Sequence, residues 1–153
     1  EHGISSYGEL ESKLNAVSAR RDTAHAEIKR IESRSAELAL VMKHAGTYRQ
    51  LKPLYDRYRK SNDKEKFLRG HESEIILFEA AARELKRLGT VPLPTMESMK
   101  TELANLNAEK ERLLAKYKAA RAEAQEYETV KQNVDALLTV PKEQEQQRRH
   151  ELE

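Results

Sequence analysis

The stretch that decides the fold runs from Met96 to Leu138 and reads MESMKTELANLNAEKERLLAKYKAARAEAQEYETVKQNVDALL. Its apolar residues recur at alternating steps of three and four, and no Gly or Pro interrupts them. A repeat of 3.5 residues carried over about six heptads by good helix formers is typical of a coiled-coil helix. The repeat passes through these positions: Met96, Met99, Leu103, Leu106, Lys110, Leu113, Tyr117, Ala120, Ala124, Tyr127, Lys131, Val134 and Leu138.

One such helix cannot bury its apolar seam alone, and the N-terminal part of the chain supplies a matching seam. At about 1.5 Å per residue, Tyr7 to Ala45 spans roughly 57 Å and Met96 to Leu138 roughly 63 Å, so the two helices can pair along most of their length. The N-terminal seam has these members: Tyr7, Leu10, Leu14, Val17, Arg21, Ala24, Ile28, Ile31, Ser35, Leu38, Met42 and Ala45.

The sequence therefore predicts an all-α fold, a long antiparallel helical hairpin (coiled coil) with a small helical tip inserted between the arms. We assign residues 1–138 to one elongated domain with arms 6–46 and 95–138 and tip 47–94. Residues 139–153 are predicted to form a polar tail that Pro141 separates from the second arm. Residues 152–153 resemble the remnant of a purification tag.

Local signals mark the ends of the helices. Ser6 with Glu9, and Thr95, are predicted to cap the two arms, and Asn62 with Glu65 is predicted to cap a short tip helix. We expect Pro53 to stop, kink or restart the first helix. Gly70 and Gly89 are predicted to end the two tip helices.

Four polar residues occupy seam positions: Arg21, Ser35, Lys110 and Lys131. Such residues often fix the register of a coiled coil, although long side chains can also reach solvent past their neighbours. We favour the second interpretation for Arg21 and the two lysines.

Composition narrows the functional classes. With 38% hydrophobic and 35% charged residues and no Trp, a thick globular core is not expected. The chain has no Cys, which fits a reducing, cytoplasmic setting, and no apolar run that could span a membrane. The five His and five Gly fall singly, outside recognised metal or phosphate-loop spacings. We therefore predict no catalytic residue, no metal and no cofactor.

One segment, Tyr48 to Arg69, has the character of a binding site because it mixes aromatic and basic residues. Basic side chains beside aromatic faces are typical of surfaces that bind single-stranded nucleic acid. The tyrosines also recur at helical spacing, so packing against Phe67, Phe78 and Leu85 is the alternative, and we favour it. The candidate binding residues are Arg49, Lys52, Tyr55, Arg57, Tyr58, Arg59, Lys60, Lys64, Lys66 and Arg69.

The run YDRYRKSNDKEKFLRGHESEIILFEAAA, from Tyr55 to Ala82, resembles the C-terminal helical region of relaxases, the mobilisation nucleases of conjugative and mobilisable elements in Gram-positive gut bacteria. The opening EHGISSYGELESKL and the Leu-Pro-Thr at 93–95 are similar to the same region, so the resemblance covers residues 1–138. It implies a parent enzyme that nicks one DNA strand with a tyrosine nucleophile and a histidine-bound metal. Those motifs are not among these residues, so no catalytic residue is carried over.

In that setting the chain is predicted to be a non-catalytic accessory domain. The implied partners are DNA at a transfer origin and an auxiliary or coupling protein of the transfer machinery, without membrane contact. The alternative is a structural coiled-coil spacer or dimerisation module that makes no DNA contact, and self-association stays open.

Overall fold

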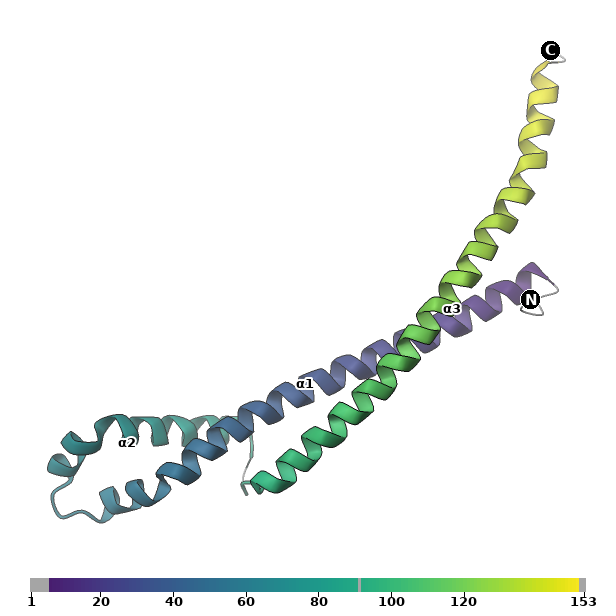
Figure 1. Ribbon diagram of the computed structural model, residues 1–153. Coiled ribbons are helices and arrows are strands. Elements are labelled where there is room, and N and C mark those ends of the chain that lie inside the picture. The colour runs from purple at the N-terminus through teal and green to yellow at the C-terminus, as the bar shows by residue number, and fades with distance from the viewer. Residues whose placement is uncertain (1–5, 91, 152–153) are drawn as a thin grey trace. The chain divides into compact units, whose positions relative to one another are not determined.

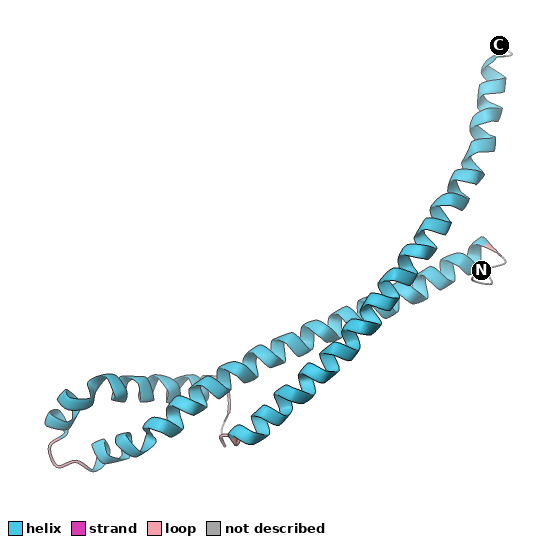
Figure 2. Ribbon diagram, in the orientation of Figure 1, coloured by secondary structure: helices cyan, strands magenta, loops and turns pink. Residues whose placement is uncertain are grey.

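The computed structural model describes residues 6–90 and 92–151, and within them all the regular structure is α-helical. The described residues form α1 (Tyr7–Lys60), α2 (Lys64–Arg87) and α3 (Met96–Glu151), which Figure 1 labels and Figure 2 colours cyan. The predicted all-α class is confirmed.

Each helix begins at a side chain that accepts a hydrogen bond from the first turn. The Glu9 amide donates to Ser6 Oγ and the Ser98 amide donates to Thr95 Oγ1, both over 3.1 Å. These are the two predicted arm caps, and both are confirmed. The cap of α2 is Asp63 and not the predicted Asn62, since Asp63 Oδ1 accepts from the Lys66 amide at 3.1 Å.

The first helix does not stop or restart at Pro53, which were two of the outcomes predicted there. It continues through Gly46 and Pro53 to Lys60. A proline inside a helix costs about 3 kcal/mol because it removes a backbone donor and crowds the preceding turn. Packing offsets that cost, because Leu54 is 9% exposed and the Tyr55 ring stacks on Phe78 of α2.

The predicted helix end at Gly70 is found only as a kink in a continuous helix. One helix, α2, runs across it, but His71 has φ −137° and ψ 24°, so the helix is kinked there. The predicted end at Gly89 is confirmed: Gly89 has φ 70° and its amide donates to the Lys86 carbonyl oxygen. A positive φ of this kind favours glycine after the last helical residue.

The predicted interruption at Pro141 is not found, since α3 continues to Glu151. One proline removes one backbone hydrogen bond, and the remaining bonds of a helix this long are retained. The predicted tag remnant, residues 152–153, lies outside the described residues.

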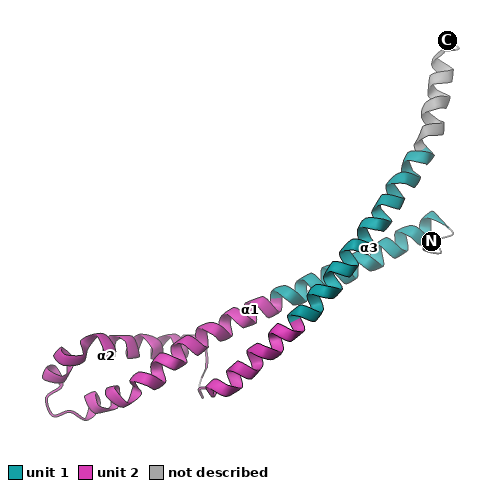
Figure 3. Ribbon diagram, in the orientation of Figure 1, with its two compact units in different colours: residues 1–29, 110–153 teal, residues 30–109 magenta. Residues whose placement is uncertain are grey.

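The chain divides into two compact units, shown in Figure 3: unit 1 is residues 1–29 and 110–153, and unit 2 is residues 30–109. In unit 1 the start of α1 packs against α3 through a core made by seam residues. Ion pairs Glu11 to Lys131 (3.7 Å) and Arg20 to Glu123 (3.5 Å) show that the two helices are antiparallel within this unit. The unit 1 core contains Leu10, Val17, Ala120, Ala124 and Tyr127, with Leu14 packed against it.

Unit 2 contains the end of α1, all of α2 and the start of α3, and all three helices contribute to its core. Ion pairs Arg30 to Glu109 (4.0 Å) and Arg34 to Glu102 (2.8 Å) again give α1 and α3 opposite directions within the unit. The buried members of this core are Leu38, Val41, Ala45, Leu85 and Met99.

Two of the polar seam residues behave as the favoured interpretation predicts. The side chains of Arg21 and Lys131 are 32% and 34% exposed, and each ends on a carboxylate, Asp22 at 3.1 Å and Glu11 at 3.7 Å. Partial exposure of this size fits long side chains whose charged ends reach solvent past their neighbours. Ser35 differs, because its hydroxyl is buried with no hydrogen-bond partner among the described residues.

Candidate nucleic-acid interface

All ten candidate binding residues lie in unit 2, at the junction of two helices. Seven of them, from Arg49 to Lys60, are in the last turns of α1, and Lys64, Lys66 and Arg69 are in the first turns of α2. Because only residues 61–63 connect the two helices, the chain itself brings the two groups together. We call the six basic residues closest to this connection the turn cations: Arg57, Arg59, Lys60, Lys64, Lys66 and Arg69.

The turn cations are all exposed. Within residues 6–90 and 92–138, where side chains are described, no carboxylate lies within ion-pair distance of any of them. Residues 57–69 hold these six cations against two acids, Asp63 and Glu65, a net charge of +4. This is the local charge excess that attracts a polyanion.

Two other predicted binding residues have roles inside the fold. Arg49 donates a hydrogen bond from Nη2 to the carbonyl oxygen of Pro94, and Lys52 lies 3.4 Å from Asp56. The Arg49 contact joins α1 to the segment that precedes α3, across 45 positions of sequence. Sequence reasoning missed it, since no local signal marks a bond to a distant carbonyl group.

The positions of the turn cations on their helices separate two physical roles. Arg57, Arg59 and Lys60 lie in the last turn of α1, where positive charge stabilises the helix dipole by about 0.3–1 kcal/mol each. Lys64 and Lys66 begin α2, where the same charge is unfavourable. Helix stability therefore accounts for the first three cations and not for these two lysines.

The aromatic side chains of the segment contact one another. The rings of Tyr48 and Tyr55 both stack on Phe78, with centroids 4.9 and 4.3 Å away and interplanar angles of 24°. Phe78 is itself only 5% exposed. Of the two interpretations of these rings, packing is the one that their contacts support.

A second group of rings continues from the first across the helix junction. Tyr58 lies 5.9 Å from Tyr55 and 6.0 Å from Phe67, and Phe67 lies 4.7 Å from His71. His71 Nδ1 is buried without a hydrogen-bond partner among the described residues, since Glu74 is 3.6 Å away. The His71 ring therefore packs beside Phe67 at the kink of α2.

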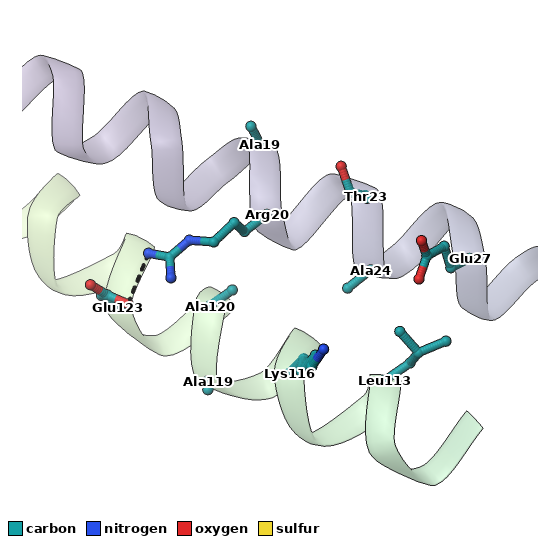
Figure 4. A pocket seen from close by; sticks show the side chains of 10 residues that line it. All are labelled: Ala19, Arg20, Thr23, Ala24, Glu27, Leu113, Lys116, Ala119, Ala120 and Glu123. Carbon is teal, nitrogen blue, oxygen red and sulfur yellow. Dashed lines mark hydrogen bonds and ion pairs between the residues drawn. The ribbon is translucent and has the colours of Figure 1, made fainter. Parts of the chain in front are cut away.

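Unit 1 holds a groove of about 590 Å³ between α1 and α3, shown in Figure 4. It forms because small seam residues, Ala24 and Ala120, face each other there, and the Arg20 to Glu123 ion pair spans it. Its lining residues include no paired nucleophile and base. The signal for the groove is the run of alanines, which sequence analysis treated only as seam residues.

The described part of the chain lacks two other features, a metal-ligand cluster and a helix able to cross a membrane. No group of three His, Asp or Glu side chains there is close enough to hold a metal ion. No helix among the same residues combines the length and the apolar character needed to cross a membrane.

Comparison with known proteins adds no identification. No protein-family model, curated protein or solved structure matches this chain. The resemblance to relaxases therefore stays a prediction.

Proposed function

We propose that this chain is a non-catalytic accessory domain of a DNA relaxase in conjugative mobilisation and that it binds DNA through the turn cations. The observation that carries the DNA contact is the set of six exposed cations, with no carboxylate within ion-pair distance in the described part of the chain, inside thirteen consecutive residues. The relaxase setting, a cytoplasmic location and a transfer auxiliary or coupling protein as a second partner come from the sequence alone.

The proposal includes the predicted architecture, a single antiparallel hairpin of α1 and α3 whose tip presents the turn cations. Support comes from the antiparallel pairing of these helices within each unit, which the ion pairs give separately. The chain has no Cys, so cysteines introduced at Ser12 and Asn62 can be spin-labelled specifically. A straight α1 predicts a distance of roughly 70 Å between them, and a value below about 50 Å would contradict the hairpin.

DNA binding is tested by titrating the chain against a fluorescent 30-base-pair duplex at several salt concentrations. Phosphate contacts predict that log K falls linearly with log salt, with a slope of about −5 if all six turn cations take part. Absence of binding at low salt would defeat the proposed function.

Two variants test which residues make the contact. Reversing Arg57, Arg59 and Lys60 to Glu should weaken binding strongly and flatten the salt dependence. The matched control reverses three exposed cations outside the tip, Lys100, Lys118 and Arg121, and changes net charge by the same amount. An equal loss of DNA affinity in the two variants would mean that net charge, and not this site, determines binding.

A gentler variant removes the risk that lost affinity reflects lost folding. Replacing Lys64 and Lys66 with Gln takes away two cations and also relieves their unfavourable interaction with the α2 dipole. We expect weaker binding, a salt slope smaller by about 2, and an unchanged or higher melting temperature. Unchanged affinity would exclude both lysines from the contact.

A second candidate function, self-association as a spacer or dimerisation module, is favoured by one observation. Near the end of its described side chains, α3 exposes apolar residues: Leu137 is 72% exposed, Leu138 61% and Val130 37%. Leu138 continues the coiled-coil repeat, Val130 and Leu137 lie beside it, and exposed apolar side chains at such positions are suited to a second helix.

A further inference from the structure

We infer that the turn cations recognise duplex DNA through its phosphates alone, and that the neighbouring aromatic rings do not stack on the bases of a single strand. This inference rests on the proposed function and specifies its ligand. It is carried by the side-by-side placement of exposed cations and rings that are already packed on one another.

The rings closest to the core cannot offer a face to a base without losing contacts inside unit 2. Tyr48 and Tyr55 each stack on Phe78, at 4.9 and 4.3 Å. Since Phe78 is 5% exposed and belongs to the buried face of α2, moving either tyrosine outward would uncover part of the core.

The outer rings, which are half-buried, also contact other rings. Tyr58 contacts both Tyr55 and Phe67, and Phe67 contacts His71 at the kink of α2. These contacts join the last turn of α1 to the first turns of α2, so they hold the turn cations in place. The rings act as the support of the basic surface and not as its ligand-binding part.

A surface that contacts only phosphate groups binds more tightly to the nucleic acid with the higher charge density. Duplex DNA carries one charge per about 1.7 Å of its axis, and neutralising it releases more counterions per contact than neutralising a single strand. In proteins that bind single strands, aromatic side chains stack on the bases and add to the binding free energy. A surface without such stacking binds a single strand more weakly. The structure therefore points to duplex DNA, bound without base preference.

The test compares a 20-nucleotide single strand with the 20-base-pair duplex of the same sequence at low salt, by fluorescence anisotropy. We expect the duplex to bind more tightly, by at least about threefold, and a duplex of scrambled sequence to bind equally. Tighter binding of the single strand would overturn the inference and leave the proposed function standing. No binding of either ligand would instead overturn the proposed function.

Stacking is tested directly with 2-aminopurine placed in the single strand, because its fluorescence changes when a ring stacks on it. We expect no change when the unmodified chain binds. In parallel, Tyr58→Leu and Tyr58→Phe should both bind duplex within about twofold of the unmodified chain, whereas a stacking ring would make the Leu variant alone lose about fivefold to a hundredfold on single strand. The 2-aminopurine result decides the question even if Tyr58→Leu is poorly folded.

Discussion

At the scale of single residues, the contact between Arg34 and Glu102 shows how one ion pair joins α1 to α3 within unit 2. Arg34 Nε lies 2.8 Å from Glu102 Oε1, and Nη2 lies 3.2 Å from Oε2, so the guanidinium group holds both carboxylate oxygens. The hydrogen bond to Glu102 raises the pKa of Arg34 above its ordinary value. Both side chains are 41% exposed, so water screens the pair.

A double-mutant cycle on Arg34→Ala and Glu102→Ala should give a coupling free energy of about 0.5–1 kcal/mol, the upper part of the range for exposed pairs, because the contact is bidentate. Thermal unfolding at low salt measures it, and 1 M salt should reduce it. The exposed pair of Arg87 with Glu84, three residues apart on α2, is the control and should couple less strongly. A coupling near zero would show that the contact with Glu102 adds nothing to stability.

Tyr7 and Asp135 make a second contact between the helices, within unit 1. The hydrogen bond from the Tyr7 hydroxyl group to Asp135 raises the pKa of Tyr7 to about 12, and desolvation contributes in the same direction. Since the neutral form is favoured in the folded state, the contact stabilises the fold fully below pH 10, the ordinary pKa of tyrosine. The contribution falls as pH rises from there and is lost above about 12.

Tyr7→Phe tests this linkage. The difference in melting temperature between the unmodified chain and the variant should be constant from pH 7 to about pH 10 and should shrink as the pH approaches 12. Absorbance at 295 nm should show one fewer high-pKa tyrosine in the variant. A difference that grows with pH would contradict the contact.

At the scale of helices, local rules place the starts and ends well and fail in the interior of α1. Ser6, Asp63 and Thr95 cap their helices because each side chain satisfies an amide that has no intrahelical partner. Gly46 and Pro53 are poor helix formers, yet α1 runs through both. Packing of Tyr48, Leu54 and Tyr55 within unit 2 decides their conformation.

The two glycines of unit 2 that differ in conformation give a matched pair of substitutions. A Cβ atom at Gly46 would meet no other atom within 4 Å, so Gly46→Ala should stabilise the chain by about 0.5–1 kcal/mol. Gly89 has φ 70°, so Gly89→Ala should destabilise it by about 1 kcal/mol despite equal space. Chemical denaturation measures both. If both variants lose stability, Gly46 has a role that the helix does not explain.

At the scale of the whole molecule, the question left by the two candidate functions is whether the chain acts alone. Leu137 and Leu138 are the most exposed large apolar residues in the described part of the chain. Sedimentation velocity over a hundredfold range of concentration should show association if these residues bind a second copy. Leu137→Lys with Leu138→Lys should then give a monomer, and Thr129→Lys with Gln132→Lys, two exposed positions on the same helix, should not.

An unchanged monomer at every concentration would remove self-association as a function and leave DNA binding untouched. Conversely, association that survives the leucine variant would place the interface elsewhere. The outcome also matters for the DNA titration, because a dimer presents two sets of turn cations and its salt slope would be larger.

The sequence by itself determined the helical class, the two seams, the starts of α1 and α3 and the end of α2, because periodicity and capping act between residues that are close in the chain. Seam positions from Leu10 to Ala45 and from Met99 to Tyr127 are buried or half-buried, as their spacing predicts. It also located the cluster of cations, since charge is visible in composition. It did not fix which of Asn62 and Asp63 caps α2, as both residues suit that role equally well.

Only the tertiary structure decided that α1 passes through Pro53 and that Tyr48 and Tyr55 pack on Phe78. It also decided that Arg49 is bound to Pro94, whereas the turn cations have no ion-pair partner within the described residues. Each of these depends on contacts between segments that are distant in the chain. Their free energies compete with local preferences of similar size, and a local pattern cannot show which of the two is larger.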